Sequence, residues 1–573
     1  MATLIREQPR LVWPADPIGR LLAFATAAHA RAVALLVLVS LAAFLPGFFQ
    51  IPPTDRDEAR FAQATKQMVE TGDFVDIRFQ DEVRYKKPVG IYWLQAAAVM
   101  AGEALGVPNA RTRIWVYRIP SLIGAIGAVL LTYWTALAFA PRRYAFLAGL
   151  MLAGSVLLSV EARLAKTDAM LLLTIVAAIG ALARAYLGRV VPAQGVASLV
   201  LPAIFWTALA AGVLLKGPVI LLIVGLTAVT LMIHDRSARW FLALRPGLGV
   251  LWLVALVSPW TWAILSRAGE TFVAESVGRD LLPKLFSGQE GHGAPPGFYF
   301  VLFWLTFWPA APLAALSAPA VWAERWERPT SFLLAWLVPS WIGFELVVTK
   351  LPHYVLPLYP AIAILIARSL WHGTLSSSVW LQRLTVGWPI VAALVPIVAV
   401  VALVAMRHQL GLLAWPFGAV AMVFGFMAWR YYDVDGAEKS LIRGVIASVL
   451  IVLVFFGIIA PSLRPLFPSA TLARVLASDP CDYKIVAAAG YSEPSLVFLV
   501  GTSIRLTDGA GAAEVLREGQ CRFALIESRE QRAFVQRAEV IGLRYAPLPR
   551  VDGINISNGR SISVAVYRSA KAP

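Results

Sequence analysis

Residues 32–49 read AVALLVLVSLAAFLPGFF, an apolar run that contains no charged residue. A helix of about 20 apolar residues spans the hydrocarbon core of a bilayer, so this run predicts the first membrane helix. Further apolar stretches follow near residues 89–106, 114–139, 143–160, 168–188, 197–215, 217–233, 247–266, 298–322, 331–349, 353–371, 387–405, 412–429 and 442–461. The stretch at 89–106 is short and interrupted, so we expect it in the interface. A polytopic α-helical membrane protein with about 13 transmembrane helices is predicted.

The composition excludes two other classes of protein. Of the 573 residues, 59% are hydrophobic and 15% are charged, whereas about 25% are charged in soluble proteins. A single soluble domain and a disordered chain are therefore excluded. We attribute the net charge of +16 mainly to basic cytoplasmic loops, with a contribution from contacts with anionic membrane lipids. No nucleic-acid partner is expected, because no recognition module is visible.

The charged residues divide the chain. Residues 1–31 are polar and basic and predict a cytoplasmic tail before a membrane domain at 32–461. Loops 51–88 and 266–297 carry both acids and bases, which favours the outer, periplasmic face. Within the first loop, residues 57–70 predict an amphipathic helix on the membrane surface, ending at Thr71-Gly72.

Residues 462–573 predict a small soluble α/β domain, on the periplasmic side if the number of spans is odd. Strands are expected at 483–490, 522–528 and 561–568, and helices at 492–500 and 512–518. Cys481 and Cys521 lie in this domain. They form a disulfide in an oxidising compartment, or they are two small buried residues.

The first loop contains two candidate chemical groups. Asp57 and Glu58 follow the first helix, where a carboxylate can act as a general base or stabilise positive charge on a sugar. The alternative is a helix start, which also favours acids. Arg84, Lys86 and Lys87 precede an apolar stretch and suit a phosphate, or they anchor the chain by reaching the interface.

Further ionisable residues interrupt apolar stretches, where they are costly and usually functional. Arg163 and Asp168 are expected to order one another, and Lys216 either snorkels or binds phosphate. His292 is a candidate base or ligand. The segment from Lys350 to Tyr354 combines a cation, an imidazole and a phenol, which suit phosphate recognition.

The order of these motifs resembles a known family. The motifs are DEAR at 57–60, Lys87-Pro88, R-x-x-x-x-D at 163–168, LLKGP at 214–218, H-x-x-P from 292 and K-LP-x-Y from 350. They resemble bacterial aminoarabinose-transferase-like glycosyltransferases, which are related to protein O-mannosyltransferases and have the GT-C membrane fold. The resemblance covers residues 30–370.

The resemblance implies an inverting transfer of a sugar from polyprenyl phosphate, normally undecaprenyl phosphate, to lipid A or a related envelope glycolipid. The reaction is expected on the periplasmic side of the bacterial inner membrane. One alternative is a protein O-mannosyltransferase-like enzyme with a polypeptide acceptor. Another is a lipid-linked sugar transporter, in which ionisable groups are spread over several spans.

By resemblance, Asp57 is the essential loop carboxylate, Asp168 is a second essential acid, and Lys87 binds phosphate. The usual run resembles Tyr-Phe-Glu-Lys-Pro, but residues 84–88 read RYKKP. Lys86 thus replaces a glutamate that helps to hold a metal with a downstream histidine. A divalent metal at His292 is thus a possible but disfavoured cofactor, and no other cofactor is predicted. A more cationic pocket suits an acidic sugar or an additional phosphate.

The catalytic candidates are therefore Asp57, Asp168 and Glu58. The substrate-binding candidates are Arg60, Arg84, Tyr85, Lys86, Lys87, Arg163, Lys216, His292, Lys350 and Tyr354.

Overall fold

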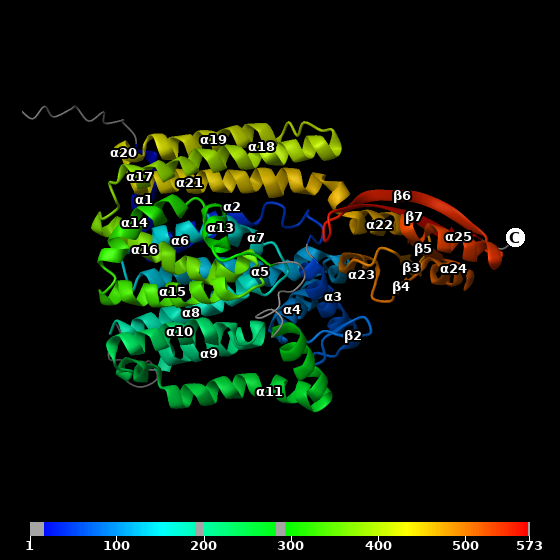
Figure 1. The fold of residues 1–573 in the computed structure, drawn as a ribbon, viewed down its shortest axis with the longest axis horizontal. Coiled ribbons are helices and arrows are strands. Elements are labelled where there is room, and N and C mark those ends of the chain that lie inside the picture. Colours follow the sequence, from blue (N-terminus) through cyan, green and yellow to red (C-terminus); the bar gives the residue numbers. More distant parts are fainter. Residues whose placement is uncertain (1–15, 55, 189–198, 282–292, 571–573) are drawn as a thin grey trace, which may run out of the picture.

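The computed structural model describes residues 16–54, 56–188, 199–281 and 293–570, apart from the side chains at 277 and 279–281. Most helices lie side by side in one bundle, and a small sheet domain stands at one end of it (Figure 1). The first half of the bundle contains α1 (Pro17–Thr26), α2 (His29–Phe44), α3 (Arg56–Thr71), α4 (Gly90–Ala104), α5 (Ile114–Ala136), α6 (Arg142–Ala153), α7 (Val156–Glu161), α8 (Asp168–Tyr186), α9 (Val200–Lys216), α10 (Val219–Asp235), α11 (Pro246–Val273) and the short helices η1 (Ala110–Thr112), η3 (Arg239–Leu244) and η4 (Ala274–Leu281).

The second half continues with α13 (Phe298–Thr306), α14 (Ala311–Ala323), α15 (Arg328–Leu346), η5 (Pro352–Leu358), α16 (Tyr359–His372), α17 (Val379–Gln382), η6 (Arg383–Val386), α18 (Gly387–Arg407), α19 (Ala414–Arg430), α20 (Tyr432–Asp435), α21 (Ala437–Val452), η7 (Leu453–Ile459), η8 (Ala460–Ser462) and η9 (Arg464–Leu466).

Six helical segments of the described residues are long and apolar enough to cross a membrane: Ile114–Ala136, Asp168–Tyr186, Pro246–Ser276, Pro352–His372, Val379–Arg407 and Ala437–Ser462. The expected number of about 13 spans is not confirmed. Several apolar runs are broken by their own residues, because proline and glycine end helices. The first run stops being α-helical at Phe44, before Pro46-Gly47, and the run at 143–160 is divided between α6 and α7 at Gly154-Ser155.

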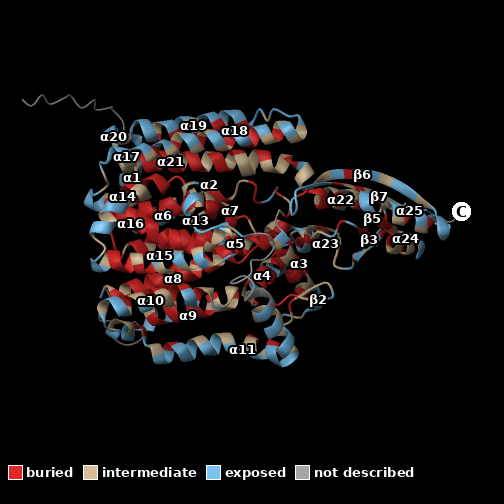
Figure 2. Ribbon diagram, viewed as in Figure 1, coloured by how far each residue is buried: buried red, intermediate tan, exposed pale blue. Residues whose placement is uncertain are grey.

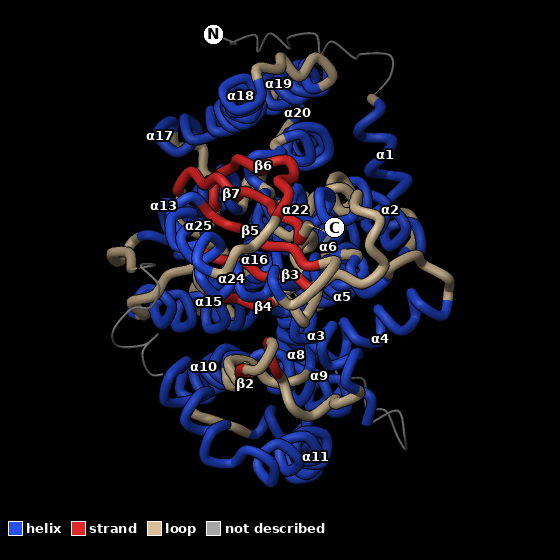
Figure 3. Tube along the Cα trace, turned by 90° about the vertical axis from the view of Figure 1, so that its right-hand side faces the viewer, coloured by secondary structure: helices blue, strands red, loops and turns tan. Residues whose placement is uncertain are grey.

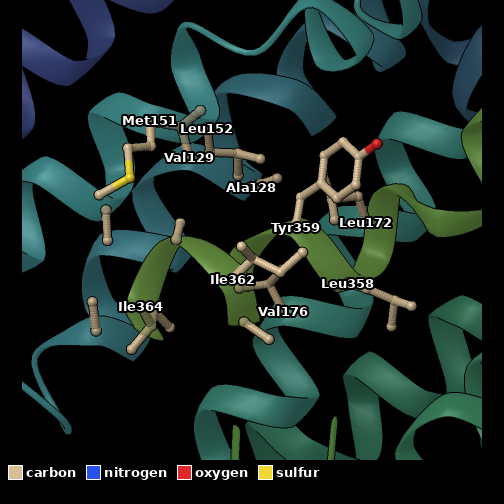
Figure 4. Packing of buried hydrophobic residues seen from close by; sticks show 14 of the residues in the cluster. Ala128, Val129, Met151, Leu152, Leu172, Val176, Leu358, Tyr359, Ile362 and Ile364 are labelled. Carbon is tan, nitrogen blue, oxygen red and sulfur yellow. The ribbon is translucent and has the colours of Figure 1, made fainter. Parts of the chain in front are cut away.

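The centre of the bundle is formed by α5, α6, α8 and α16. In Figure 2 these helices are largely buried, whereas α11, α18 and α19 are mostly exposed or half-buried. Figure 4 shows how Val129 of α5, Met151 of α6, Val176 of α8 and Ile362 of α16 lie in one cluster. The exposed apolar faces of the outer helices suit a lipid environment.

Helix α3 confirms the expected helix of the first loop and ends before Gly72, whose φ is +72°. The helix is buried between the bundle and the sheet domain, and its position at the membrane surface stays a prediction. Polar residues on α3 have buried partners: Thr65 donates to Gln95 Oε1 at 2.7 Å, and Gln63 donates to Thr502 Oγ1 at 2.8 Å. Two short strands, β1 (Arg78–Phe79) and β2 (Glu82–Val83), pair antiparallel just after it.

The sheet domain contains α22 (Pro468–Ala477), β3 (Ile485–Ala489), α23 (Pro494–Val500), β4 (Arg505–Thr507), α24 (Gly509–Arg517), β5 (Arg522–Glu527), η10 (Ser528–Glu530), α25 (Gln531–Val540), β6 (Tyr545–Asn555) and β7 (Arg560–Ser569). Its strand order is β4-β3-β5-β7-β6, as the end view in Figure 3 shows. Strand β3 is parallel to β4 and β5, whereas β7 is antiparallel to β5 and β6. The expected soluble α/β fold is present, with β4 and β6 as additional strands.

The domain is attached to the bundle through α3. Lys66 donates to the carbonyl of Phe498 at 3.1 Å, Gln80 donates to the carbonyls of Thr502 and Ile504, and Arg56 pairs with Glu493 at 3.2 Å. The helix that begins beside Asp57 is therefore held from two sides.

Cys481 and Cys521 form a disulfide that joins residues 40 positions apart. A disulfide that closes a loop of this size stabilises a domain by about 2–4 kcal/mol. We expect Cys481→Ser/Cys521→Ser to make the sheet domain more sensitive to limited proteolysis and to lower its unfolding temperature in the full chain. In the wild type, both thiols should react with a maleimide only after reduction. Labelling without reduction would contradict the bridge.

Candidate active site

A buried ion pair fixes the start of α3. Arg118 of α5 donates to both oxygens of Glu58, at 2.7 and 3.0 Å, and both side chains are almost fully buried. Glu58 also accepts from the backbone N–H groups of Thr54 and Ala165. These contacts favour a structural role for Glu58, because its carboxylate is held by a guanidinium and by the chain itself.

Asp57 precedes this anchor and is half-exposed, with Arg60 at 3.6 Å one helical turn later. Partial desolvation opposes its ionisation, but the charges of Arg84, Lys166 and Arg60 outweigh that cost and lower the pKa of the carboxyl. The carboxyl of Asp57 is therefore an ionised group with several basic neighbours.

A second acidic group lies where α7, α8 and η5 meet. Glu161 ends α7, Asp168 begins α8, and His353 lies in η5. The imidazole is 3.7 Å from each carboxylate. Lys166 lies 3.5 Å from Glu161. His353 is also an electrostatic neighbour of Asp57, so the two acidic groups belong to one ionic cluster.

Lys216 connects this cluster to α9. Its ammonium pairs with Asp168 and lies 5.5 Å from the ring centroid of Tyr354. Lys216 ends α9 immediately before Gly217, whose φ is +66°. This turn brings a basic residue from an apolar helix to the junction of α7 and α8.

Glu161, Asp168 and His353 could hold a metal ion by residue type, since one ligand atom from each lies within 4.8 Å of the others. Both carboxylates, however, have a lysine partner. An ammonium group already compensates the charge that a divalent cation would neutralise. The donor set therefore fits an ion-pair network better than a metal centre.

Several sequence-predicted residues lie in other environments. Arg163 does not pair with Asp168 among the described residues; it donates to carbonyls of Ala43, Pro46 and Ser159. Arg163 therefore connects the end of α2 to the end of α7 through hydrogen bonds to their backbone carbonyls. Lys350 donates to the carbonyls of Glu345 and Val347, at 2.8 and 2.7 Å, and so caps the end of α15.

The residues of the basic run in the first loop differ in how far they are buried. Tyr85 is buried and donates to Asp76 at 2.7 Å, and burial together with this bond raises the pKa of its phenol. Lys86 is exposed, Lys87 is half-buried and Arg84 is buried. His292 lies outside the described residues.

The structure thus brings together Asp57, Arg60, Arg84, Asp168, Lys216 and Tyr354. Sequence reasoning assigned no role to Glu161 and placed His353 only in a phosphate-binding segment. Both residues interrupt apolar stretches at helix junctions, and this signal could have identified them.

The sequence and the fold of this chain are similar to those of known membrane glycosyltransferases. A sequence model of the family described as dolichyl-phosphate-mannose-protein mannosyltransferase matches residues 35–268. The undecaprenyl phosphate-alpha-4-amino-4-deoxy-L-arabinose arabinosyl transferase of Aeromonas hydrophila is 28% identical over 334 residues, 56% of this chain and 57% of that protein. Its namesake from Pseudomonas aeruginosa is 28% identical over 325 residues, 55% of each chain. The chain thus spans little more than half the length of these relatives.

The crystal structure of ArnT from Cupriavidus metallidurans in the apo state has a TM-score of 0.73 at 19% identity. The match covers 93% of this chain and 97% of that one. The same enzyme bound to undecaprenyl phosphate also has a TM-score of 0.73. These findings confirm the resemblance to aminoarabinose-transferase-like glycosyltransferases and the GT-C membrane fold. The protein is a multi-pass membrane protein.

The buried ion pair between Glu58 and Arg118 allows the role of Glu58 to be tested. Glu58→Gln leaves the Arg118 guanidinium buried without its counter-charge, which costs about 3–5 kcal/mol. We expect a lower unfolding temperature of the detergent-solubilised protein, measured by tryptophan fluorescence, whereas the exposed control Glu82→Gln should unfold like the wild type. An unchanged unfolding temperature with abolished turnover would instead make Glu58 a catalytic residue.

Proposed function

We propose that this protein is a glycosyltransferase that moves a sugar from undecaprenyl phosphate to lipid A or a related envelope glycolipid. The observation that carries the proposal is the cluster around Asp57, in which an ionised carboxylate lies among basic residues at the bundle end that meets the sheet domain. The names of the relatives and the structure of ArnT with undecaprenyl phosphate support this substrate class.

The basic residues stabilise the leaving group. Cleavage of the sugar–phosphate bond leaves charge on a phosphate oxygen, and preorganised cations lower the energy of that state. Lys87, from the loop after α3, and Lys216, at the end of α9, are the residues we assign to it. Because a lipid phosphate is already a good leaving group, no strong general acid is required.

The acids act on the sugar and on its acceptor. Positive charge develops on the sugar ring during transfer, and Asp57 or Asp168 stabilises it. Asp57 takes the proton when the acceptor is a hydroxyl, and no base is needed when the acceptor is a phosphate. Attack from the face opposite to the leaving phosphate inverts the sugar carbon. Lys216 and His353 orient Asp168.

We place the reaction on the periplasmic side of the inner membrane. The disulfide of the sheet domain supports an oxidising compartment for residues 462–573. Loop 51–88 contacts that domain and therefore lies on the same side. Residues 1–31 form the cytoplasmic tail and residues 32–461 the membrane domain in this proposal.

A polypeptide acceptor is the second candidate, because the matching family model describes a protein mannosyltransferase. The same assay distinguishes the two acceptors, since a labelled sugar would then appear on peptide rather than on lipid A.

Asp57→Asn removes the proposed base and should reduce transfer at least 100-fold, the usual scale of general-base catalysis. Purified protein would be incubated with undecaprenyl-phosphate-linked sugars and lipid A, and released undecaprenyl phosphate would be measured. The exposed loop residue Asp81, changed to Asn, is the matched control and should retain wild-type turnover. Wild-type turnover in Asp57→Asn would remove Asp57 from catalysis, and no release from any donor would overturn the transferase.

The lowered pKa of Asp57 predicts how the transfer rate depends on pH in the acidic range. A depressed pKa keeps the carboxylate ionised as the pH falls, so activity is lost only when the pH passes below the folded value. With a hydroxyl acceptor, kcat/KM should stay constant from pH 7 to about 4, near the ordinary pKa of aspartate. A loss of rate centred above pH 5 would assign the base to another group.

A further inference from the structure

The ionic cluster of the proposed active site contains more basic residues than carboxylates. Each of its three carboxylates has a basic partner, in the pairs Asp57–Arg60, Glu161–Lys166 and Asp168–Lys216. Arg84 is the fourth cation of this group and forms no salt bridge with the part of the chain that the structure describes. These four cations therefore outnumber the three carboxylates by one.

The position of Arg84 is fixed by its surroundings. Its backbone N–H donates to the carbonyl of Ile77 at 2.8 Å, next to the β1–β2 hairpin. Its guanidinium lies over the ring of Phe61, 5.2 Å from the centroid. The residue is 8% exposed, and its Nε is buried without a hydrogen-bond partner among the described residues. Asp57 is an electrostatic neighbour of this buried guanidinium but forms no salt bridge with it. A buried N–H group that lacks an acceptor is costly, so this guanidinium suits an anionic ligand.

We propose that Arg84 binds a carboxylate carried by the transferred sugar, so that the donor is an acidic sugar such as a uronic acid linked to undecaprenyl phosphate. The inference rests on the proposed function, in which Asp57 faces the sugar and Lys87 and Lys216 receive the leaving phosphate. A planar guanidinium suits a carboxylate because it offers two parallel donors. The aromatic face of Phe61 holds that plane in place.

The same charge disfavours a basic sugar. The names of the relatives specify a 4-amino-4-deoxy sugar, whose amine is a cation at neutral pH. Placed beside Arg84, such a group would be repelled by the guanidinium and would offer no acceptor to its buried N–H. An acidic and an amino sugar thus make opposite predictions for this chain.

The experiment compares three undecaprenyl-phosphate-linked donors, carrying glucuronate, glucose or aminoarabinose, with one lipid A acceptor. Released undecaprenyl phosphate gives kcat/KM for each donor. The wild type should prefer glucuronate to glucose about 10- to 100-fold, the effect of a charge-assisted hydrogen bond. Arg84→Gln should abolish this preference while changing the glucose reaction much less, and Arg84→Lys should retain part of it.

The exposed Arg111, which pairs with Glu103 outside the cluster, provides the control variant Arg111→Gln, whose donor preference should equal that of the wild type. Preference for glucose or aminoarabinose in the wild type would overturn the inference but leave the transferase standing. An effect of Arg84→Gln that follows removal of the lipid A phosphates rather than the sugar carboxylate would also overturn it. The wild-type comparison decides the question even if Arg84→Gln does not fold. Failure to release undecaprenyl phosphate from any donor would contradict the proposed function itself.

Discussion

The buried pair between Glu58 and Arg118 is the contact on which the geometry of the candidate active site depends. The guanidinium of Arg118 also donates to the carbonyls of Phe48, Ile51 and Pro52, at 2.8–3.1 Å. One side chain of α5 thus organises the whole connection between α2 and α3. Through Ala165, Glu58 extends the network to the segment between α7 and α8. The two halves of the ionic cluster, around Asp57 and around Asp168, are therefore set by the same pair.

The main effect of this buried ion pair is to position the backbone around Asp57, whereas its net contribution to the free energy of unfolding is small. Burying two charges is costly, and the attraction between them repays that cost only with good geometry and further hydrogen bonds. Here five additional hydrogen bonds complete the network: backbone N–H groups donate two to Glu58, and Arg118 donates three to backbone carbonyls. The backbone on either side of Asp57 therefore has few alternative conformations, and the proposed role of Asp57 as a base requires such restraint.

The local features of this fold could be predicted from sequence, whereas its pairings could not. The helix that became α3 and the strands β3, β5 and β7 follow from periodicity, because each repeats apolar residues over a short range. The convergence of Asp57 and Asp168 was implied by a resemblance in motif order. The partner of Asp168 was predicted as Arg163 but is Lys216, since three backbone carbonyls 4 to 120 residues from Arg163 accept its hydrogen bonds. The number of about 13 spans is not confirmed, because proline and glycine divide apolar runs that composition alone treats as continuous.

The attachment of the sheet domain to α3 has a consequence for any shortened form of this protein. Lys66 and Gln63 are buried, and their described hydrogen bonds reach acceptors in the sheet domain. Burial also lowers the pKa of the Lys66 ammonium, a sign of how little water reaches it. Removing the domain would uncover one side of α3 and leave the helix that carries Asp57 supported from the bundle alone. A shortened form without the sheet domain would therefore lack one of the two sets of contacts that position the helix of the candidate active site.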